Sequence, residues 1–584
     1  MKKHILLSSL LFASISSFAA RLPTAVTPNH YAITITPDLA GETFHGEETI
    51  DVDVKEPVSS ITMNAIGFEN SANEMITLTV PQPIAAGPAS IHIAFDAPIN
   101  KKLRGLYLSQ TPTRKYAVTQ FEPTDARRAF PSFDEPSMKA TFDISLVVDK
   151  SDTAISNAPI LSDSPEGDTK HRIRFATTKK MSTYLVAMLI GDFQCIEGGV
   201  DGTPIRVCTT PGRQQNGQFA LEAAQAAVHF YNQYYDVKYP FQKLDLIGIP
   251  DFEAGAMENA GAVTFRETAL LIDPKTASIG QRKGVAGTVA HEIAHMWFGD
   301  LVTMKWWDDI WLNEGFATFM TSKPIETWKP EWNERLDTVG ITLGSLGLDS
   351  QRATRNIRTQ AETSEEINQL FDGIAYGKTA AVLRMIEQWM GEDAFRDGIR
   401  AYLKKYSWSN AAAEDFWGTM TTTSGKPVDV VMKSFVDQPG APLVHTTDSC
   451  SSDTRTVVLL QDRLLPRGQD EARTWTLPIC PSKSDKCTVA KTAKESLSVR
   501  GCTSTLFLNR DGRGYYVTDY SARERQLRRA DDAAGEREPS RHADASRHRR
   551  LPRAAARDAA AGGTAAGRVD RGQSGGSRSP ARER

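Results

Sequence analysis

The segment His291-Glu292-Ile293-Ala294-His295 constrains the fold of this chain more than any other stretch. Residues four apart share one face of a helix, so a helix here lets both imidazoles reach one metal ion. Apolar Val285 and Val289 indicate that this helix is buried, and Gly299 can end it. The same motif also arises by chance, and in that case the histidines lie on the surface and Glu292 only solvates the helix.

A third metal ligand is expected at Glu314, because 18 residues separate it from His295 and a helix, a turn and an antiparallel helix fit that gap. Two histidines and one carboxylate, with water in the fourth position, form the ligand set of a catalytic zinc site. We therefore predict one Zn²⁺ per chain, bound by His291, His295 and Glu314. Glu292 lies between the ligands and is predicted to be the general base for the attacking water.

The 584 residues predict several domains, and the periodicity changes along the chain. Residues 20–211 contain short alternating runs with Pro and Gly punctuation, which predict an all-β domain. Residues 212–438 are mostly helical in period, and residues 439–521 return to short β-runs.

The N-terminus has the pattern of a secretory signal peptide. Lys2 and Lys3 precede a short apolar run, and small residues lead up to a cut after Ala19, so residues 1–19 predict export to a periplasm or beyond. A buried helix or a membrane anchor is the alternative. No later run of 18 apolar residues occurs, so no integral membrane segment is expected after cleavage.

The last part of the chain, residues 522–584, has a different composition from the rest. It carries 16 Arg, no Lys and 9 acidic residues, a net charge of +7, whereas residues 1–521 carry -10. So few large apolar residues cannot offset the ordering entropy, and a disordered tail is predicted. Such a composition also arises when a GC-rich gene is read out of frame, so a frameshift product and a real basic tail both stay open. Without interleaved aromatics, no nucleic-acid partner is expected.

Six cysteines allow 15 pairings, so their connectivity cannot be deduced. No CxxC pair occurs, which argues against a cysteine zinc site. Proximity in the sequence favours Cys195–Cys208 and Cys480–Cys487, which leaves Cys450–Cys502. Six free buried thiols are the alternative.

Several further motifs occur in a fixed order around the histidine motif: TQFEPTDARRAFPSFDEP at 119–136, GAMEN at 255–259, FDGIAYGKTAAVLRMI at 371–386 and DQPGAPLV at 437–444. With them the chain resembles the M1 family of zinc aminopeptidases, the aminopeptidase N type. The resemblance implies a multidomain α+β protein with an N-terminal all-β domain, a thermolysin-like, mainly helical zinc-peptidase domain and a small β-sandwich domain. That family usually continues with a large helical domain, so we expect this chain to be C-terminally truncated.

The resemblance also implies how a substrate is held. Glu258 and Glu122 would bind the free α-ammonium group of a peptide, with Gln120 beside them, since carboxylates are natural partners for an ammonium. Within the GAMEN segment, the small residues Gly255 and Ala256 would lie along the substrate. Met257 and Asn259 complete that segment. Taken alone, Glu122 reads as a solvated strand residue.

Tyr376 matches the family tyrosine that donates a hydrogen bond to the developing oxyanion. A packed aromatic is the alternative for Tyr376, and Tyr402 or Tyr406 are alternatives for the role. The family usually has Gly where Thr379 stands, a departure that we expect to be harmless.

The resulting expectation is a zinc aminopeptidase that releases single amino acids from peptides with a free N-terminus. The alternative is a catalytically impaired zinc- and peptide-binding protein, because the helical domain is missing. An endopeptidase with the same metal site is disfavoured, since an ammonium anchor is useless in the middle of a chain.

Overall fold

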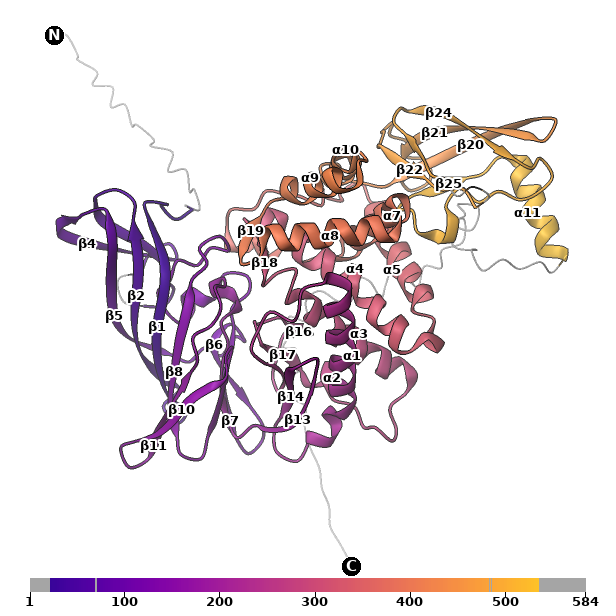
Figure 1. The fold of residues 1–584 in the computed structure, drawn as a ribbon. Coiled ribbons are helices and arrows are strands. Elements are labelled where there is room, and N and C mark those ends of the chain that lie inside the picture. Colours follow the sequence, from indigo (N-terminus) through magenta and orange to yellow (C-terminus); the bar gives the residue numbers. More distant parts are fainter. Residues whose placement is uncertain (1–20, 69–70, 483, 485, 535–584) are drawn as a thin grey trace, which may run out of the picture.

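The computed structural model describes residues 21–68, 71–482, 484 and 486–534. It contains a group of strands at one end, a mainly helical group in the middle and a second group of strands at the other end (Figure 1). This arrangement confirms the predicted α+β fold class. The predicted signal peptide and residues 535–584 of the predicted tail lie outside the described residues. Within the described part, no helix has the length and apolarity that a membrane crossing requires.

The N-terminal strands form a six-stranded sheet, a four-stranded sheet and a hairpin. The strands are β1 (Val26–Asp38), β2 (Thr43–Val54), β3 (Val58–Asn64), β4 (Met75–Ile84), β5 (Gly87–Pro98), β6 (Gly105–Gln110), β7 (Lys115–Gln120), β8 (Thr141–Asp149), β9 (Thr153–Ser156), β10 (Ile160–Glu166), β11 (Lys170–Phe175) and β12 (Met188–Gly191). The strand orders are β10-β11-β8-β1-β2-β5, β6-β7-β12-β9 and β3-β4. Alternate residues of β2 are buried, as the period of two predicts for a sheet with one covered face.

The next sheet has five strands in the order β13-β14-β15-β17-β16. They are β13 (Gln194–Val200), β14 (Thr203–Thr209), β15 (Leu244–Ile249), β16 (Ala256–Met257) and β17 (Ala262–Arg266). Every residue of β15 is buried, so this strand needs a partner on each edge, and β14 and β17 provide them. The sheet therefore extends across the predicted domain boundary at residue 211.

Helices α1–α3 lie along one side of this sheet, and helices form most of the middle of the molecule (Figure 1). They are α1 (Gln218–Tyr235), α2 (Glu267–Leu270), α3 (Ile279–His295), α4 (Trp311–Trp328), α5 (Glu334–Asp349), α6 (Ser364–Asn368), α7 (Thr379–Met390), α8 (Glu392–Tyr406), α9 (Ala413–Ser424) and α10 (Val428–Val436). A capping box of Ser278 and Gln281 starts α3. The connection from α3 to α4 is more than the predicted turn, because it contains β18 (Val302–Met304), which pairs with β19 (Ser409–Ala411).

The C-terminal strands form a four-stranded sheet in the order β24-β21-β20-β25 and a two-stranded sheet, β22-β23. They are β20 (Pro442–Ser451), β21 (Thr454–Arg463), β22 (Leu477–Ile479), β23 (Thr488–Ala490), β24 (Lys494–Arg500) and β25 (Val517–Asp519).

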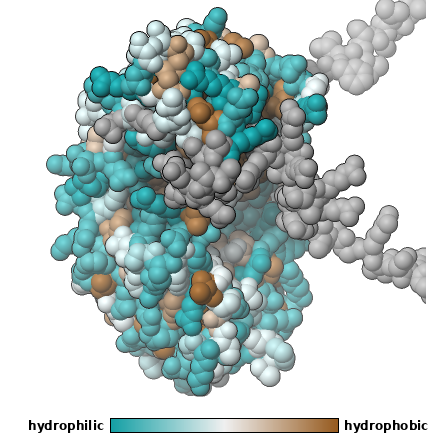
Figure 2. Space-filling model, turned by 90° about the vertical axis from the view of Figure 1, so that its right-hand side faces the viewer, coloured by the Kyte–Doolittle hydropathy of each residue, from teal (hydrophilic) through white to brown (hydrophobic). Residues whose placement is uncertain are grey.

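On the face of the molecule shown in Figure 2, hydrophobic residues are scattered among hydrophilic ones.

The prediction that disorder begins at residue 522 is wrong for the first turns of that segment. Residues Ala522–Ala534 form α11. Glu524 is buried there, its carboxylate lies 2.9 Å from the Arg455 guanidinium, and it accepts a hydrogen bond from the Leu506 N–H. Ion pairing and hydrogen bonding thus fix a helix that a composition-based argument, which counts only apolar residues, does not foresee.

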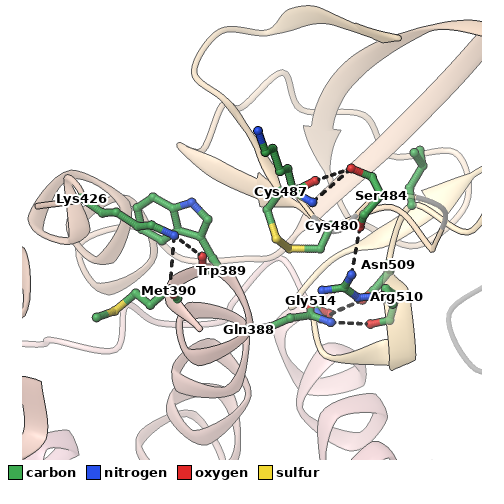
Figure 3. The surroundings of a disulfide bond; sticks show 12 residues. Gln388, Trp389, Met390, Lys426, Cys480, Ser484, Cys487, Asn509, Arg510 and Gly514 are labelled. Carbon is green, nitrogen blue, oxygen red and sulfur yellow. Dashed lines mark hydrogen bonds between the residues drawn. A yellow bond between two sulfur atoms is a disulfide. The ribbon is translucent and has the colours of Figure 1, made fainter. Parts of the chain in front are cut away.

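The two disulfides that sequence proximity favoured, Cys195–Cys208 and Cys480–Cys487, are present, and so is the remaining pair, Cys450–Cys502. The first joins directly paired residues of β13 and β14. The third lies beside the end of α7, where the Gln388 amide donates to the Arg510 carbonyl oxygen (Figure 3).

Candidate active site

Helices α3 and α4 bring the three predicted metal ligands together. His291 and His295 lie one turn apart on α3, and Glu314 lies in the first turn of α4. The Glu314 Oε2 atom is 3.3 Å from the Nε2 atom of each histidine, and the two Nε2 atoms are 3.1 Å apart. A tetrahedral zinc site with ligand distances of about 2.0 Å has ligand–ligand edges of about 3.3 Å. The three atoms therefore fit a zinc ion without rearrangement.

The surroundings of these ligands favour metal binding. The His295 Nδ1–H donates to the Phe298 carbonyl oxygen over 3.0 Å, which leaves Nε2 as the ligand atom. Burial lowers the pKa of His291, so its imidazole is held neutral, as a ligand must be. Burial opposes ionisation of Glu314, but the two neighbouring histidines outweigh it and lower the pKa of this carboxyl.

Glu292 lies between the histidines on α3 and lines the same cavity. Its side chain is buried, with 5% of its surface exposed. Burial, together with the negative charges of Glu258 and Glu314, raises its pKa well above the ordinary value. A carboxyl with a raised pKa accepts a proton more readily near neutral pH, which suits a general base.

Two further carboxylates from different parts of the chain face this site. Glu122 follows β7 and Glu258 follows β16, and each can place one oxygen within 4.8 Å of the other and of Glu314. The Oε1 atoms of both are buried and accept no hydrogen bond within the described residues. Burial raises the pKa of each, and for Glu122 the charge of Glu258 adds to it. Buried acceptors without donors favour a cationic or donor-rich ligand.

Gln120 and Asn259 flank these carboxylates. Gln120 lines the cavity, and its Oε1 atom is also buried without a donor in the described part of the chain. The Asn259 amide instead donates to the Thr264 hydroxyl over 3.1 Å, which holds the segment after β16 in place. Asn259 is thus buried behind the cavity wall.

The segment Gly255–Met257 forms an edge of the five-stranded sheet. Among the strands that the structure describes, β16 pairs only with β17, so no described strand occupies its other edge, where an extended ligand could pair. A Cβ atom added at Gly255 would meet no atom within 4 Å, so the backbone here borders open space. Met257 is buried and contributes to the cavity lining.

Tyr376 lies in a π-helical turn, Ile374–Lys378, that leads into α7. Its ring stacks beside that of His291, with 6.0 Å between centroids and 13° between planes. Burial and the nearby Glu314 raise the pKa of its phenol, so the group stays protonated and can donate. The alternatives lie elsewhere: Tyr402 stacks on Phe298, and the Tyr406 hydroxyl donates to Asp415.

The site lies in a cavity of about 580 Å³. Sequence reasoning missed part of its wall, including Leu103, Arg104, Thr318, Ile341, Asn368 and Phe371. These residues come from loops and helices distant in sequence, and even Phe371, which starts the motif at 371–386, has no spacing that marks it as part of the wall.

Two family models match this chain: the Peptidase family M1 domain over residues 219–435, and the Peptidase M1 N-terminal domain over residues 27–185. Among curated relatives, Aminopeptidase M1-C of Oryza sativa subsp. japonica is 36% identical, and the match covers 86% of this chain and 61% of the relative. The Puromycin-sensitive aminopeptidase of Caenorhabditis elegans is 36% identical over 86% of this chain and 57% of its own length. The Alanine/arginine aminopeptidase of Saccharomyces cerevisiae is 36% identical, and the match covers 86% of this chain and 62% of the relative.

The chain spans about 60% of the length of these curated relatives. The prediction of export to a periplasm or beyond is contradicted, because the nematode and yeast relatives are cytosolic aminopeptidases. The N-terminal residues that suggested export lie outside the described structure. A charged start and a short apolar run are therefore an insufficient basis for assigning this chain to an export route.

The M1 aminopeptidases are zinc-dependent, which confirms the predicted cofactor. The relatives' names do not support the alternative of an impaired peptide-binding protein. Both M1 models match in their expected order, and the relatives match over most of the chain, so the protein belongs to peptidase family M1.

Proposed function

We propose that this protein is a zinc-dependent aminopeptidase that hydrolyses the N-terminal bond of peptides and releases single amino acids. One observation carries the proposal: a metal-ligand triad with edges of 3.1–3.3 Å shares a cavity with the carboxylates of Glu122 and Glu258, each of which has a buried Oε1 atom without a donor in the described chain. A metal site alone fits many hydrolases, and the added cation site selects a substrate with a free ammonium group.

His291, His295 and Glu314 would hold the zinc ion. When bound there, zinc lowers the pKa of a water molecule and polarises a carbonyl group. Glu292 takes the proton of the attacking water and returns it to the departing amine, a role that its raised pKa supports.

Tyr376 donates a hydrogen bond to the scissile carbonyl oxygen as negative charge develops there. Because that charge appears only in the transition state, the contribution of the phenol falls mainly on kcat. The stacking of Tyr376 on His291 supports this assignment, since it places the ring beside a metal ligand.

Glu122 and Glu258 bind the substrate ammonium, and Gln120 adds an acceptor beside them. The free edge of β16 at Gly255 and Ala256 supports an extended peptide running along it. Met257 forms part of the wall and Asn259 fixes the segment through Thr264. With the ammonium fixed, only the first peptide bond reaches the metal.

The test is hydrolysis of an aminoacyl chromogenic substrate by the full chain, with a chelator and after zinc is added back. We expect chelation to abolish release and zinc to restore it. Glu292→Gln is the matched variant, and it should retain zinc while losing activity. Release that resists the chelator, or Glu292→Gln with wild-type activity, would overturn the proposal.

A further inference from the structure

A buried ion pair lies directly behind Tyr376, outside the cavity. Lys378 is two residues after Tyr376, and its Nζ atom is 2.8 Å from Oδ2 of Asp349, the last residue of α5. Both side chains are fully buried, with no exposed area. Neither residue lines the cavity. The proposed chemistry therefore does not use this pair directly.

Most hydrogen bonds of this ion pair come from the C-terminal part of the chain. The Lys378 ammonium donates to the Gly440 carbonyl oxygen over 3.1 Å, and the Gly440 N–H donates to Asp349 Oδ1 over 3.0 Å. The Tyr515 hydroxyl donates to Asp349 Oδ2 over 3.1 Å, and the Thr354 hydroxyl donates to Oδ1 over 3.0 Å. Gly440 precedes β20 and Tyr515 precedes β25, so the strands of the C-terminal sheet reach the turn that carries Tyr376.

The other end of α7 is fastened to the same part of the chain. The Gln388 amide donates to the Arg510 carbonyl oxygen over 2.9 Å (Figure 3), and Arg513 forms an ion pair with Glu387. Helix α7 is thus held at both ends. Movement of its first turn would displace Tyr376, because the π-helical turn Ile374–Lys378 runs directly into it.

Burying two charges is costly even when they are paired, and apolar residues of similar volume usually stabilise a fold as well or better. The Lys378–Asp349 pair is hydrogen-bonded by Thr354, Gly440 and Tyr515, which come from three segments of the chain. Such directional bonds define the place of the Lys378 side chain much more narrowly than apolar packing does. A displacement of about 1 Å at a reacting group can cost about 100-fold in rate. The position of the Tyr376 phenol is where such precision matters.

We propose that Lys378 is a positioning residue for Tyr376, and that Asp349, Gly440 and Tyr515 fix its place, so that the C-terminal sheet sets the geometry of the oxyanion donor. This inference rests on the proposed function. It adds a role for the C-terminal part of the chain, none of whose described residues contributes to the cavity lining.

The test compares Lys378→Met, the double variant Lys378→Met/Asp349→Asn and the control Arg455→Met. Arg455 forms a buried ion pair with Asp448 inside the C-terminal sheet, so its loss destabilises that sheet without touching α7. For each full-length variant, kcat, KM, zinc content, thermal stability and hydrogen exchange of the amides of 374–379 are measured.

Lys378→Met should lower kcat by at least tenfold, change KM by less than about threefold and speed exchange at 374–379, with zinc retained. The double variant removes the lone buried charge, so it should regain stability while kcat stays low. Arg455→Met should lose stability and keep kcat. If Lys378→Met does not fold, kcat and the exchange at 374–379 of the double variant test the proposal in its place.

The proposal is overturned if kcat returns with stability in the double variant, or if exchange at 374–379 is unchanged. It is also overturned if Arg455→Met lowers kcat as much as Lys378→Met does. If the wild-type chain releases no amino acid, the proposed function fails, and the exchange measurement still decides whether Lys378 fixes the turn.

Discussion

Gly315 follows the metal ligand Glu314 in α4 and faces Thr379, the first residue of α7. A Cβ atom added at Gly315 would lie 2.5 Å from the Thr379 Cβ, closer still to its Cγ2, and 3.1 Å from the Ala375 carbonyl oxygen. Carbon atoms in contact normally lie about 3.5–4.0 Å apart. Gly315→Ala therefore forces α4 and the start of α7 apart by about 1 Å or more, because rotation of the Thr379 side chain does not move its Cβ atom.

This separation moves Glu314 and Tyr376 relative to each other. We expect kcat/KM to fall by about 100-fold, which corresponds to about 2.7 kcal/mol of lost transition-state stabilisation. Overpacking should also lower the free energy of unfolding by about 1–3 kcal/mol. The assay is steady-state hydrolysis of an aminoacyl substrate, alongside chemical denaturation.

A second substitution isolates the steric cause. Thr379→Gly removes both atoms that clash, so Gly315→Ala/Thr379→Gly should recover most of the activity and give a coupling energy well above zero in a double-mutant cycle. Gly418→Ala on α9 is the matched control, since a Cβ there meets no atom within 4 Å. Gly315→Ala with wild-type kcat/KM would refute the reasoning, as would a double variant no better than Gly315→Ala.

Three further predictions follow from single groups. Tyr376→Phe should lower kcat by about 100-fold or more with little change in KM, measured by steady-state kinetics. A rise of KM with kcat unchanged would instead show that the phenol binds the ground state and the transition state equally. Burial lowers the pKa of Lys139 to about 7, so above pH 7 the unfolded chain binds more protons than the folded one and stability rises with pH, by about 2 kcal/mol between pH 7 and 9. Lys139→Met should abolish that rise in urea titrations, and an unchanged pH profile would contradict it. Cys450→Ser opens the link to Cys502, 52 residues away, and should cost about 4 kcal/mol in the chain-entropy description; a thermal midpoint equal to that of the wild type would disprove a structural role.

The metal site was predictable because a helix repeats every 3.6 residues, which puts His291 and His295 on one face whatever surrounds them. The three disulfides were predictable for a different reason: two of them join residues close in sequence, and the third pair was the remainder. Glu122 was readable only through its resemblance to a family motif, since a single carboxylate after a strand has no spacing that marks it.

The rest depends on contacts between residues distant in sequence. Lys378 and Asp349 pair across 29 positions, and although Lys378 lies in the motif at 371–386, no spacing in the sequence links it to Asp349. The start of α11 was predicted to be disordered because its composition is polar, and the ion pair of Glu524 with Arg455 fixes it nonetheless. Every residue of β15 is buried, and β14 pairs with one of its edges, which brings β13 and β14 into the central sheet. The alternation of residues along one segment does not show which strands pair with one another.

The central claim is that an ammonium anchor directs a zinc site to the first peptide bond. Mass spectrometry of a short peptide incubated with the full chain tests it directly, with the same peptide N-acetylated as the comparison. The account predicts stepwise loss of single residues from the free peptide only, and the acetylated peptide left intact. Internal fragments, or equal cleavage of the acetylated peptide, would contradict it.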